Sequence, residues 1–520
     1  MTGKILWVDD EISLLRPHIL YLVSKGYELE TSTNGYDAIR LVKQKDFDLV
    51  ILDEMMVGMD GLETLRQIKA ADGDIKAVMV TKSEEEGIFL EAVGNMIDDY
   101  LTKPVSPLQL YLSIRKNLEK EDLISDNMSK NYIKNYKVIS GMIDKDPDFN
   151  GWITINHMIT GWNLRLDEIK DINLAETFDD LRRSANMTFG NYIQENYHKW
   201  ISDQSERPVL SNEVLDKFVL PDLEAEKTAF IVIDCLPYDQ MSVIEEVLKE
   251  NFSIIKESYY SILPTATQFA RNAIFSGLFP SEIEEKHPEF SNVNYDDESS
   301  SNRFEKELLE KKLISSGLDL GRKLKYSKAY RIDEFAKIES GMNELRDTTL
   351  FALVVNMVDF LVHDKKKGEL VSEMMFNESS YRSTIKSWFS SSSLLRIITS
   401  LGEMGFRIVI TTDHGAKLIN KYTKVSGDGF ISSGLRLKFG KNLTTSNKKQ
   451  TFFWQKPADY KMPSSFKGMN IILAKEDHCF VFEKGLNDFY RQIKNSFQHG
   501  GVSLEEVILP VMILKRKNRG

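Results

Sequence analysis

Ile408-Val-Ile-Thr-Thr-Asp413-His414-Gly415 decides the fold of the larger part of this chain, because it is an apolar, strand-like run that stops at a carboxylate, an imidazole and a glycine. Asp234 stands directly after the similar run Phe230-Ile-Val-Ile, and Asp359 follows a third run, with His363 four residues later. In sheets of alternating strands and helices, ligand sites lie at the carboxyl ends of the strands. We therefore expect residues 209–520 to form an α/β domain whose polar residues meet at one edge of a sheet.

The strands of this domain are expected where apolar, β-branched runs are longest. They are 228–234, 349–358, 407–412, 470–474 and 507–514.

A second group of strand-terminating acids opens the chain. Asp9 and Asp10 follow the run 4–8, and Asp53 follows the run that begins at Phe47. Further strands are expected at 27–31, 77–81 and 100–103, with helical patterns between them at a spacing of about 20–25 residues, as in βα units. Residues 1–120 are therefore predicted to be a separate, doubly wound parallel-sheet domain of the flavodoxin-like kind.

The residue types in this first domain suit phosphoryl transfer. Asp9, Asp10 and Asp53 would form an oxygen-rich pocket for Mg²⁺, and Asp53 can act as a carboxylate nucleophile. Thr81 and Lys103, which end later strands, supply a hydroxyl and a positive charge. Because Pro104 follows Lys103, a cis peptide bond is expected between them.

This set of residues resembles the receiver domain of two-component response regulators over residues 1–120. The resemblance implies phosphorylation of Asp53 by a sensor histidine kinase. It also implies that Tyr100 is the aromatic switch residue, whose burial changes when Thr81 moves, and that phosphorylation promotes a homodimer.

Residues 121–208 are expected to form a helical-bundle linker. Phe178, Leu181, Ala185, Phe189 and Ile193 recur at three- and four-residue steps, as on one face of a helix. The alternative is a helix-turn-helix DNA reader, but the segment has no basic recognition helix. The chain's net charge of -11 also argues against non-specific duplex DNA binding.

The large domain combines carboxylate and imidazole ligands, which favours Zn²⁺ or Mn²⁺ over Mg²⁺. Two such ions would clamp the oxygens of an in-line phosphoryl displacement. Thr265 and Thr267 precede a helical pattern, and local chemistry makes either one a candidate nucleophile. Thr267 alone could equally be a helix N-cap.

Two motifs, Thr-Thr-Asp413-His414-Gly and His499-Gly-Gly-Val-Ser503, resemble the PglZ-type domain of the alkaline phosphatase superfamily, and the resemblance covers about 225–514. It implies that the nucleophile is Thr267, nine residues before the run Ser276-Gly-Leu-Phe-Pro280. It also implies two Zn²⁺ sites. One would be held by Asp234, Thr267, Asp413 and His414, and the other by Asp359, His363 and His499.

Two residues of this domain have open interpretations. His478 competes with His499 for the second metal, although the glycines after His499 favour close approach to an ion. Arg271 lies one helical turn after Thr267 and is a candidate contact for a substrate phosphate, with a surface salt bridge as the alternative.

The stretch 440–465 carries lysines beside Phe452, Phe453 and Trp454. Basic and aromatic residues together suit a nucleotide or a single-stranded nucleic acid. The alternative is a hairpin whose aromatic side chains pack on the core.

The bulk composition restricts the cellular setting. No stretch approaches the ~20 apolar residues of a membrane span, and the N-terminal run is too short for a signal peptide. Two cysteines exclude a disulfide framework, so a cytoplasmic location is expected.

The order of the three parts resembles the PorX-type family of response regulators, which implies regulation of type IX protein secretion, with secretion-system or sigma-factor proteins as candidate partners. We expect a zinc-dependent phosphodiesterase controlled by Asp53 phosphorylation, acting on nucleotides or oligonucleotides. The alternative is a weakly catalytic or non-catalytic metal-containing binding module that signals by dimerisation and protein contacts. A phosphomonoesterase or phosphomutase is the third hypothesis.

Overall fold

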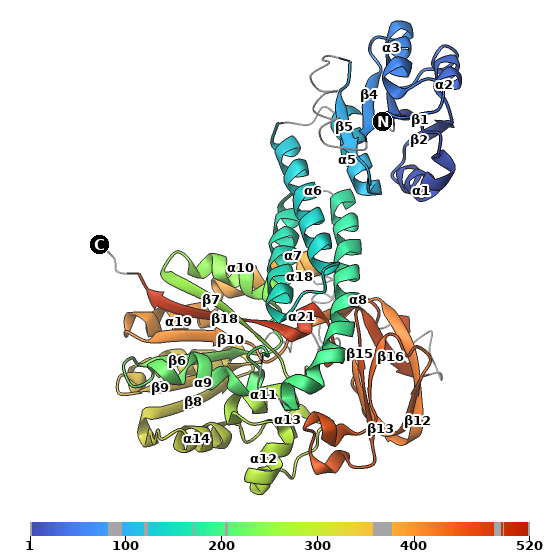
Figure 1. Cartoon of the computed structure of the whole chain (residues 1–520). Coiled ribbons are helices and arrows are strands. Elements are labelled where there is room, and N and C mark those ends of the chain that lie inside the picture. Colours follow the sequence, from blue (N-terminus) through green and yellow to red (C-terminus); the bar gives the residue numbers. More distant parts are fainter. Residues whose placement is uncertain are drawn as a thin grey trace. The chain divides into compact units, whose positions relative to one another are not determined.

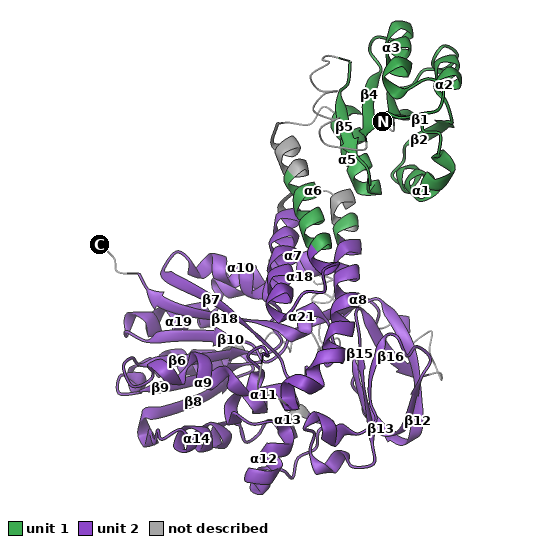
Figure 2. Cartoon of the chain, viewed as in Figure 1, with its two compact units in different colours: residues 1–141, 172–178 green, residues 142–171, 179–520 purple. Residues whose placement is uncertain are grey.

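The structure is a computed structural model of the chain that describes residues 3–81, 96–118, 123–169, 172–202, 206–356, 377–482, 490–491 and 493–517. It divides into two compact units (Figure 2). Residues 1–141 with 172–178 form the first unit, and residues 142–171 with 179–520 form the second. Among the described helices, none is both long and apolar enough to cross a bilayer.

The first unit contains a five-stranded parallel sheet of order β2-β1-β3-β4-β5, visible in blue in Figure 1. The strands are β1 (Lys4–Val8), β2 (Glu28–Ser32), β3 (Leu49–Asp53), β4 (Lys76–Thr81) and β5 (Asp99–Thr102). This is the strand order of flavodoxin-like sheets, in which ligands bind at the carboxyl ends of the strands. The predicted fold of the N-terminal part is therefore confirmed.

Four described helices connect or follow these strands: α1 (Arg16–Ser24), α2 (Gly35–Val42), α3 (Gly61–Ala71) and α5 (Pro107–Leu118). Local capping fixes where two of them begin. Asn34 accepts a hydrogen bond from the Asp37 amide (2.9 Å), and Asp60 accepts one from the Glu63 amide (2.7 Å). Each cap satisfies a backbone N–H group that the first helical turn leaves without a partner.

Three long helices follow: α6 (Leu123–Ile143), α7 (Phe149–Ile169) and α8 (Ile172–Ser202). In the second unit, the apolar side chains of α8 predicted to share one face are buried, including Ala185, Phe189 and Ile193. Phe189 packs edge-on against Trp152 of α7, with ring centroids 5.2 Å apart. The helical interpretation of this segment is confirmed.

The second unit is built on a six-stranded sheet of order β7-β18-β10-β6-β9-β8. Its strands are β6 (Thr228–Ile233), β7 (Phe252–Tyr260), β8 (Leu324–Ala329), β9 (Leu350–Val355), β10 (Arg407–Thr411) and β18 (Ile508–Arg516). The four strands from β10 to β8 are parallel, whereas β18 runs antiparallel to both of its neighbours. The predicted α/β effector fold is confirmed.

Helices cover both faces of this sheet, which explains why its central strands are apolar on both sides. One face packs against α10 (Tyr238–Leu248), α15 (Ile332–Ser340), α18 (Glu378–Ser391) and α19 (Ser393–Glu403). The other packs against α9 (Val214–Phe218), α11 (Thr267–Ser276) and α14 (Glu305–Ser315). The remaining short helices are α12 (Pro280–Lys286), α13 (Glu298–Ser301) and α21 (Leu504–Val507).

A second sheet lies in the C-terminal third, drawn in orange in Figure 1, with strand order β14-β15-β13-β12-β16. It comprises β12 (Lys421–Ile431), β13 (Leu437–Thr445), β14 (Thr451–Trp454), β15 (Asn470–Ala474) and β16 (His478–Phe482). A two-stranded ladder pairs β11 (Lys417–Ile419) with β17 (Ser496–Gln498). The strand expected at 470–474 therefore exists, but it belongs to this mainly antiparallel sheet.

The stretch 440–465 does not form a hairpin, because β14 pairs with β15 and not with β13, but two of its aromatic side chains pack on the core. Trp454 is 0% exposed, and its ring stacks on Tyr460 at 4.3 Å between centroids. Phe452 is also buried, which leaves Phe453 as the partly exposed aromatic of the three. Packing on the core therefore makes the rings of Phe452 and Trp454 unavailable for stacking on bases, whereas Phe453 is 39% exposed.

Candidate metal-dependent active site

The receiver acids converge at the carboxyl edge of the first sheet. Asp9, Asp10 and Asp53 each offer an oxygen, and these atoms lie within 4.8 Å of one another. Lys103 Nζ lies 2.9 Å from Asp53 Oδ2 and 3.4 Å from Asp9 Oδ2. Asp9 and Asp53 are buried and Asp10 is exposed. The neighbouring parallel strands β1 and β3 explain the convergence, because their carboxyl ends share one edge.

Burial raises the pKa of Asp53, and the nearby Asp9 and Asp10 add to this shift, while Lys103 opposes it. A divalent cation between the carboxylates would favour the ionised form, and three oxygen donors suit a hard ion of this kind. Receiver domains generally bind divalent metals, and the donor set here agrees with that property.

The two residues predicted to act as a switch lie on the last two strands of the receiver sheet. Thr81 ends β4 and is buried, and Tyr100 lies on β5 opposite Met79 in a half-buried position. The Lys103–Pro104 peptide bond is cis, as predicted.

The effector acids meet in the same way at the second sheet. Asp234 follows β6 and Asp413 follows β10, and these two strands pair in parallel. One donor atom from each of Asp234, Asp413 and His414 lies within 4.8 Å of the others, and all three residues are fully buried. His414 Nε2 is 3.6 Å from Asp234 Oδ1.

Thr267, the first residue of α11, faces this cluster. Its Oγ1 lies 2.8 Å from His414 Nε2 and 3.5 Å from Asp234 Oδ1. The Thr265 hydroxyl instead donates to the Gly501 carbonyl (2.7 Å). The geometry therefore separates two threonines that local chemistry left equivalent.

The two candidate histidines have different surroundings. The His499 ring stacks on His414, with centroids 4.3 Å apart. His478 Nδ1 lies 3.0 Å from Thr423 Oγ1, in a separate group with Glu476 and Asp477. Asp359 and His363, the other ligands expected for a second metal, lie outside the described residues.

Close backbone packing shapes the turn after His414. A Cβ at Gly415 would lie 1.9 Å from the Glu505 carbonyl oxygen, so no larger residue fits without moving the backbone. Cys235 donates its amide to Asp413 Oδ1 at 3.4 Å. The cluster is thus held by main-chain contacts on two sides.

Arg271 is 1% exposed and forms a buried ion-pair network, so the surface salt bridge is wrong. Its guanidinium lies 2.6 Å from Asp234 Oδ2 and 3.7 Å from Asp413 Oδ2, and its Nε lies 2.6 Å from Glu305 Oε1. These carboxylates offset the cost of burying the guanidinium, and the pKa of Arg271 rises well above its usual range. Its contact with a substrate phosphate stays a prediction.

Glu305 is a residue of this network that sequence reasoning missed. Besides Arg271 it accepts hydrogen bonds from Tyr326 (2.5 Å) and Lys328 (3.0 Å). Burial favours the neutral form, but Arg271 and Lys328 hold the pKa of Glu305 below its usual value. It opens the highly charged helix α14, so its local sequence looks like a solvated surface.

The donor set fits a transition metal. Asp413 Oδ2 is buried and accepts no hydrogen bond from the described part of the chain, although the Arg271 guanidinium lies 3.7 Å from it, so it can still serve as a ligand atom. Carboxylate, imidazole and hydroxyl donors together suit Zn²⁺ or Mn²⁺.

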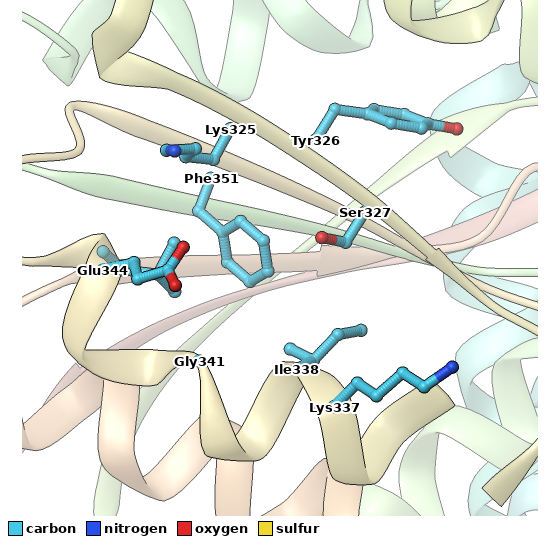
Figure 3. A pocket seen from close by; sticks show the side chains of 9 residues that line it. Lys325, Tyr326, Ser327, Lys337, Ile338, Gly341, Glu344 and Phe351 are labelled. Carbon is cyan, nitrogen blue, oxygen red and sulfur yellow. The ribbon is translucent and has the colours of Figure 1, made fainter. Parts of the chain in front are cut away.

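A separate hollow of about 280 Å³ lies along the edge strand β8 (Figure 3). It is lined by Lys325, Tyr326 and Ser327 of β8, Phe351 of β9, and residues of α15 and of the turn after it. Its position along the strand distinguishes it from the carboxyl-edge cluster.

Receiver, helical linker and α/β effector together define a response regulator with an alkaline phosphatase-like effector. The receiver domain model of response regulators matches residues 5–115, and the PorX response regulator linker model matches 122–201. The model of the BREX system PglZ alkaline phosphatase-like domain matches residues 214–514, more than half of the chain. The chain therefore belongs to the PglZ alkaline phosphatase-like family, and its order of parts is the PorX-type architecture. Its receiver implies a sensor kinase partner.

The similar proteins cover the receiver region. The transcriptional regulatory protein ResD of Bacillus subtilis is 34% identical over 144 residues, which are 28% of this chain and 60% of that protein. The chain thus spans less than two thirds of this relative. A CheY-like receiver domain of Methanospirillum hungatei has 29% identity and a TM-score of 0.22, covering 23% of this chain and 96% of that one. The response regulator TrrA of Thermotoga maritima has 31% identity and a TM-score of 0.21, covering 22% and 100%.

Proposed function

We propose that this protein is a response regulator whose effector is a zinc-dependent phosphodiesterase with Thr267 as nucleophile. The observation that carries the proposal is the 2.8 Å contact between Thr267 Oγ1 and His414 Nε2 inside the buried group Asp234, Asp413 and His414. A hydroxyl so placed at the start of a helix also faces the end that favours an anionic phosphate.

In this proposal the Thr267 oxygen loses its proton and attacks phosphorus, and one alcohol of the diester leaves with a proton, which gives a phosphodiester of Thr267. Water then cleaves the bond between phosphorus and Thr267, which restores the hydroxyl and releases a phosphate monoester. One Zn²⁺ would be held by Asp234, Thr267, Asp413 and His414. The other would be held by Asp359, His363 and His499. When bound, the ions lower the pKa of the hydroxyl and offset negative charge on the ester oxygens.

The contacts of Arg271 give it a positioning role within the proposal. Its guanidinium bonds to Asp234 Oδ2, and Asn356 donates to the same oxygen at 2.9 Å. These two donors direct Asp234 so that Oδ1 faces Thr267 and His414. Glu305 in turn holds Arg271 in place.

The receiver would control this site. A sensor histidine kinase would phosphorylate Asp53 with Mg²⁺ at Asp9 and Asp10, and movement of Thr81 and Tyr100 would promote a homodimer. A cavity of about 540 Å³ borders Asp9 and Lys103 beside this group of acids. The PorX-type order of parts supports a cytoplasmic role in type IX secretion, with secretion-system or sigma-factor partners and a nucleotide or oligonucleotide substrate.

The test is hydrolysis of bis(p-nitrophenyl) phosphate by the zinc-loaded full chain, compared with Thr267→Val and Thr267→Ser. We expect turnover in the wild type, loss of at least about 100-fold in Thr267→Val, and partial retention in Thr267→Ser, which keeps the hydroxyl. Faster hydrolysis of p-nitrophenyl phosphate would indicate a monoesterase. Turnover that is unchanged in Thr267→Val would refute the assignment of the nucleophile.

Burial of the whole cluster favours a second candidate function, a metal-containing binding module that signals through phosphorylation-driven dimerisation. Thr267, Asp234 and His414 are all fully buried, so a substrate would need the site to open. Metal-loaded wild type that binds zinc at the cluster, dimerises after phosphorylation and shows no turnover would identify this function.

A further inference from the structure

A second group of potential ligands occupies the turn between β15 and β16. Glu476, Asp477 and His478 each offer a donor atom, and these atoms lie within 4.8 Å of one another. The residues are 7%, 4% and 8% exposed, respectively. The proposed phosphodiesterase does not use this group, because its histidine neighbour of His414 is His499.

Three of the four carboxylate oxygens of this group lack hydrogen-bond donors among the described residues, and Glu476 accepts one side-chain hydrogen bond, from Gln450. Both oxygens of Asp477 and Oε1 of Glu476 are buried and accept no hydrogen bond from any residue that the structure describes. Buried carboxylate oxygens without partners are unfavourable, because they lose their hydration and gain no compensating contact. A native protein retains such an arrangement when another group, commonly a cation, supplies the missing interaction.

The neighbouring side-chain cations do not supply enough charge. Lys421 Nζ lies 3.2 Å from Asp477 Oδ1, but its side chain is 46% exposed and solvated. Lys475 directs its Nζ to Asn191 (2.8 Å) and Gln194 (3.2 Å) of α8. One solvated lysine therefore faces two adjacent buried carboxylates.

Other cations close to the group already have partners. A cavity of about 80 Å³ borders Glu476 and Asp477 and is also lined by Arg182 and Lys417. Arg182 pairs with Asp179 (3.0 Å) and with Glu378, and Lys417 pairs with Glu505 (2.5 Å). The cavity gives the Asp477 and Glu476 side chains space beside them.

A side-chain contact holds one ring nitrogen of His478. Its Nδ1 contacts Thr423 Oγ1 at 3.0 Å, and when Nδ1 donates in this bond the Nε2 lone pair is available to a metal. The hydroxyl thus fixes the ring in the way that an outer hydrogen bond fixes a ligand.

We infer that Glu476, Asp477 and His478 bind one divalent cation of the zinc or manganese class, at a site separate from the Asp234, Asp413 and His414 cluster. Two carboxylates and one imidazole are the donor set these ions prefer, whereas Mg²⁺ and Ca²⁺ favour oxygen donors alone. Because adjacent Lys475 bonds to α8, the ion would stabilise the turn where the second sheet meets this helix.

The experiment measures the zinc bound to the full chain by mass spectrometry after chelation and reloading. Variants are Asp477→Asn, Asp413→Asn and the double variant, with Asp428→Asn, an exposed carboxylate of the same sheet, as the matched control. We expect Asp477→Asn to bind one zinc fewer than the wild type, Asp428→Asn to match it, and the losses of Asp477→Asn and Asp413→Asn to add. A folded Asp477→Asn variant with wild-type zinc content would overturn the inference.

Anomalous diffraction from crystals of the wild type loaded with Zn²⁺ or Mn²⁺ decides the matter even if Asp477→Asn fails to fold. A peak of either ion between Glu476, Asp477 and His478 supports the inference, and loaded crystals without such a peak contradict it. The result is independent of the phosphodiesterase proposal, which concerns Thr267 and hydrolysis.

Discussion

Arg436 and Glu506 form a fully buried ion pair whose disruption we expect to unfold the region around His499 locally. Glu506 Oε1 accepts from Arg436 Nε (2.7 Å) and the Gly501 amide (2.9 Å), and Oε2 accepts from an Arg436 terminal nitrogen (2.7 Å) and the Ser503 hydroxyl (2.8 Å). Arg436 also donates to the carbonyls of Ala474 and His478. The pair therefore joins β13 to the segment that carries His499.

Arg436→Met removes both charge-assisted bonds and leaves Glu506 with the Gly501 amide and the Ser503 hydroxyl. Removing one partner of a buried pair costs about 3–5 kcal/mol. In a chain of two units a single unfolding energy is poorly defined, so the assay is hydrogen exchange of peptides covering 434–440 and 496–507. Each ~1.4 kcal/mol corresponds to a tenfold change, so local opening should become at least about 100-fold more frequent.

The control is the exposed pair Lys386–Glu246, whose side chains are 50% and 43% exposed. Lys386→Met should cost no more than about 1 kcal/mol. Combining Arg436→Met with Glu506→Leu should cost less than the sum of the single changes by roughly 2–3 kcal/mol, because no unpaired charge remains. Exchange unchanged in Arg436→Met, or strict additivity in the double variant, would refute the reasoning.

Gly415→Ala should destabilise the second unit by about 3 kcal/mol or more, because its Cβ would meet the Glu505 carbonyl. Gly141→Ala, in an open helical position of the first unit, should stabilise that unit by about 0.5–1 kcal/mol. Hydrogen exchange of peptides from each unit measures the two effects separately. Burial lowers the pKa of Lys438 from its usual 10.5 to about 8. Because the unfolded chain binds more protons than the folded one between these pH values, stability should rise with pH across this window by at most about 3 kcal/mol relative to Lys438→Met. If stability, measured by urea unfolding from pH 7 to pH 10, has the same dependence on pH in both proteins, this prediction is wrong. Asp53→Asn should abolish phosphorylation by acetyl phosphate, since the amide is not a nucleophile. Phosphate-affinity gels measure this, and a shifted band of the Asp53→Asn variant would show that another residue is phosphorylated.

Local patterns in the sequence determined the elements and the positions of most candidate site residues. Apolar runs predicted β1, β3, β6 and β10, and the acids after them had to lie at the carboxyl ends of those strands. Once the strands were taken as parallel, Asp9 and Asp53, like Asp234 and Asp413, were expected at one edge. These inferences succeed because strand periodicity and chain reversal are short-range properties.

The tertiary structure alone decided which buried charges meet. Glu305 pairs with Arg271, 34 residues away in the sequence, and Glu506 pairs with Arg436, 70 residues away. No local sequence pattern predicts such partners. The resemblance to the PglZ-type domain already favoured Thr267 over Thr265, and the structure adds that the Thr267 hydroxyl is the one that faces His414. Of the second sheet the sequence predicted only β15, since β12 is rich in polar residues and glycine and forms no apolar run. From the sequence, a charged side chain in a polar helix is expected to be solvated. When tertiary packing excludes water from that side chain, the charge needs a partner inside the protein.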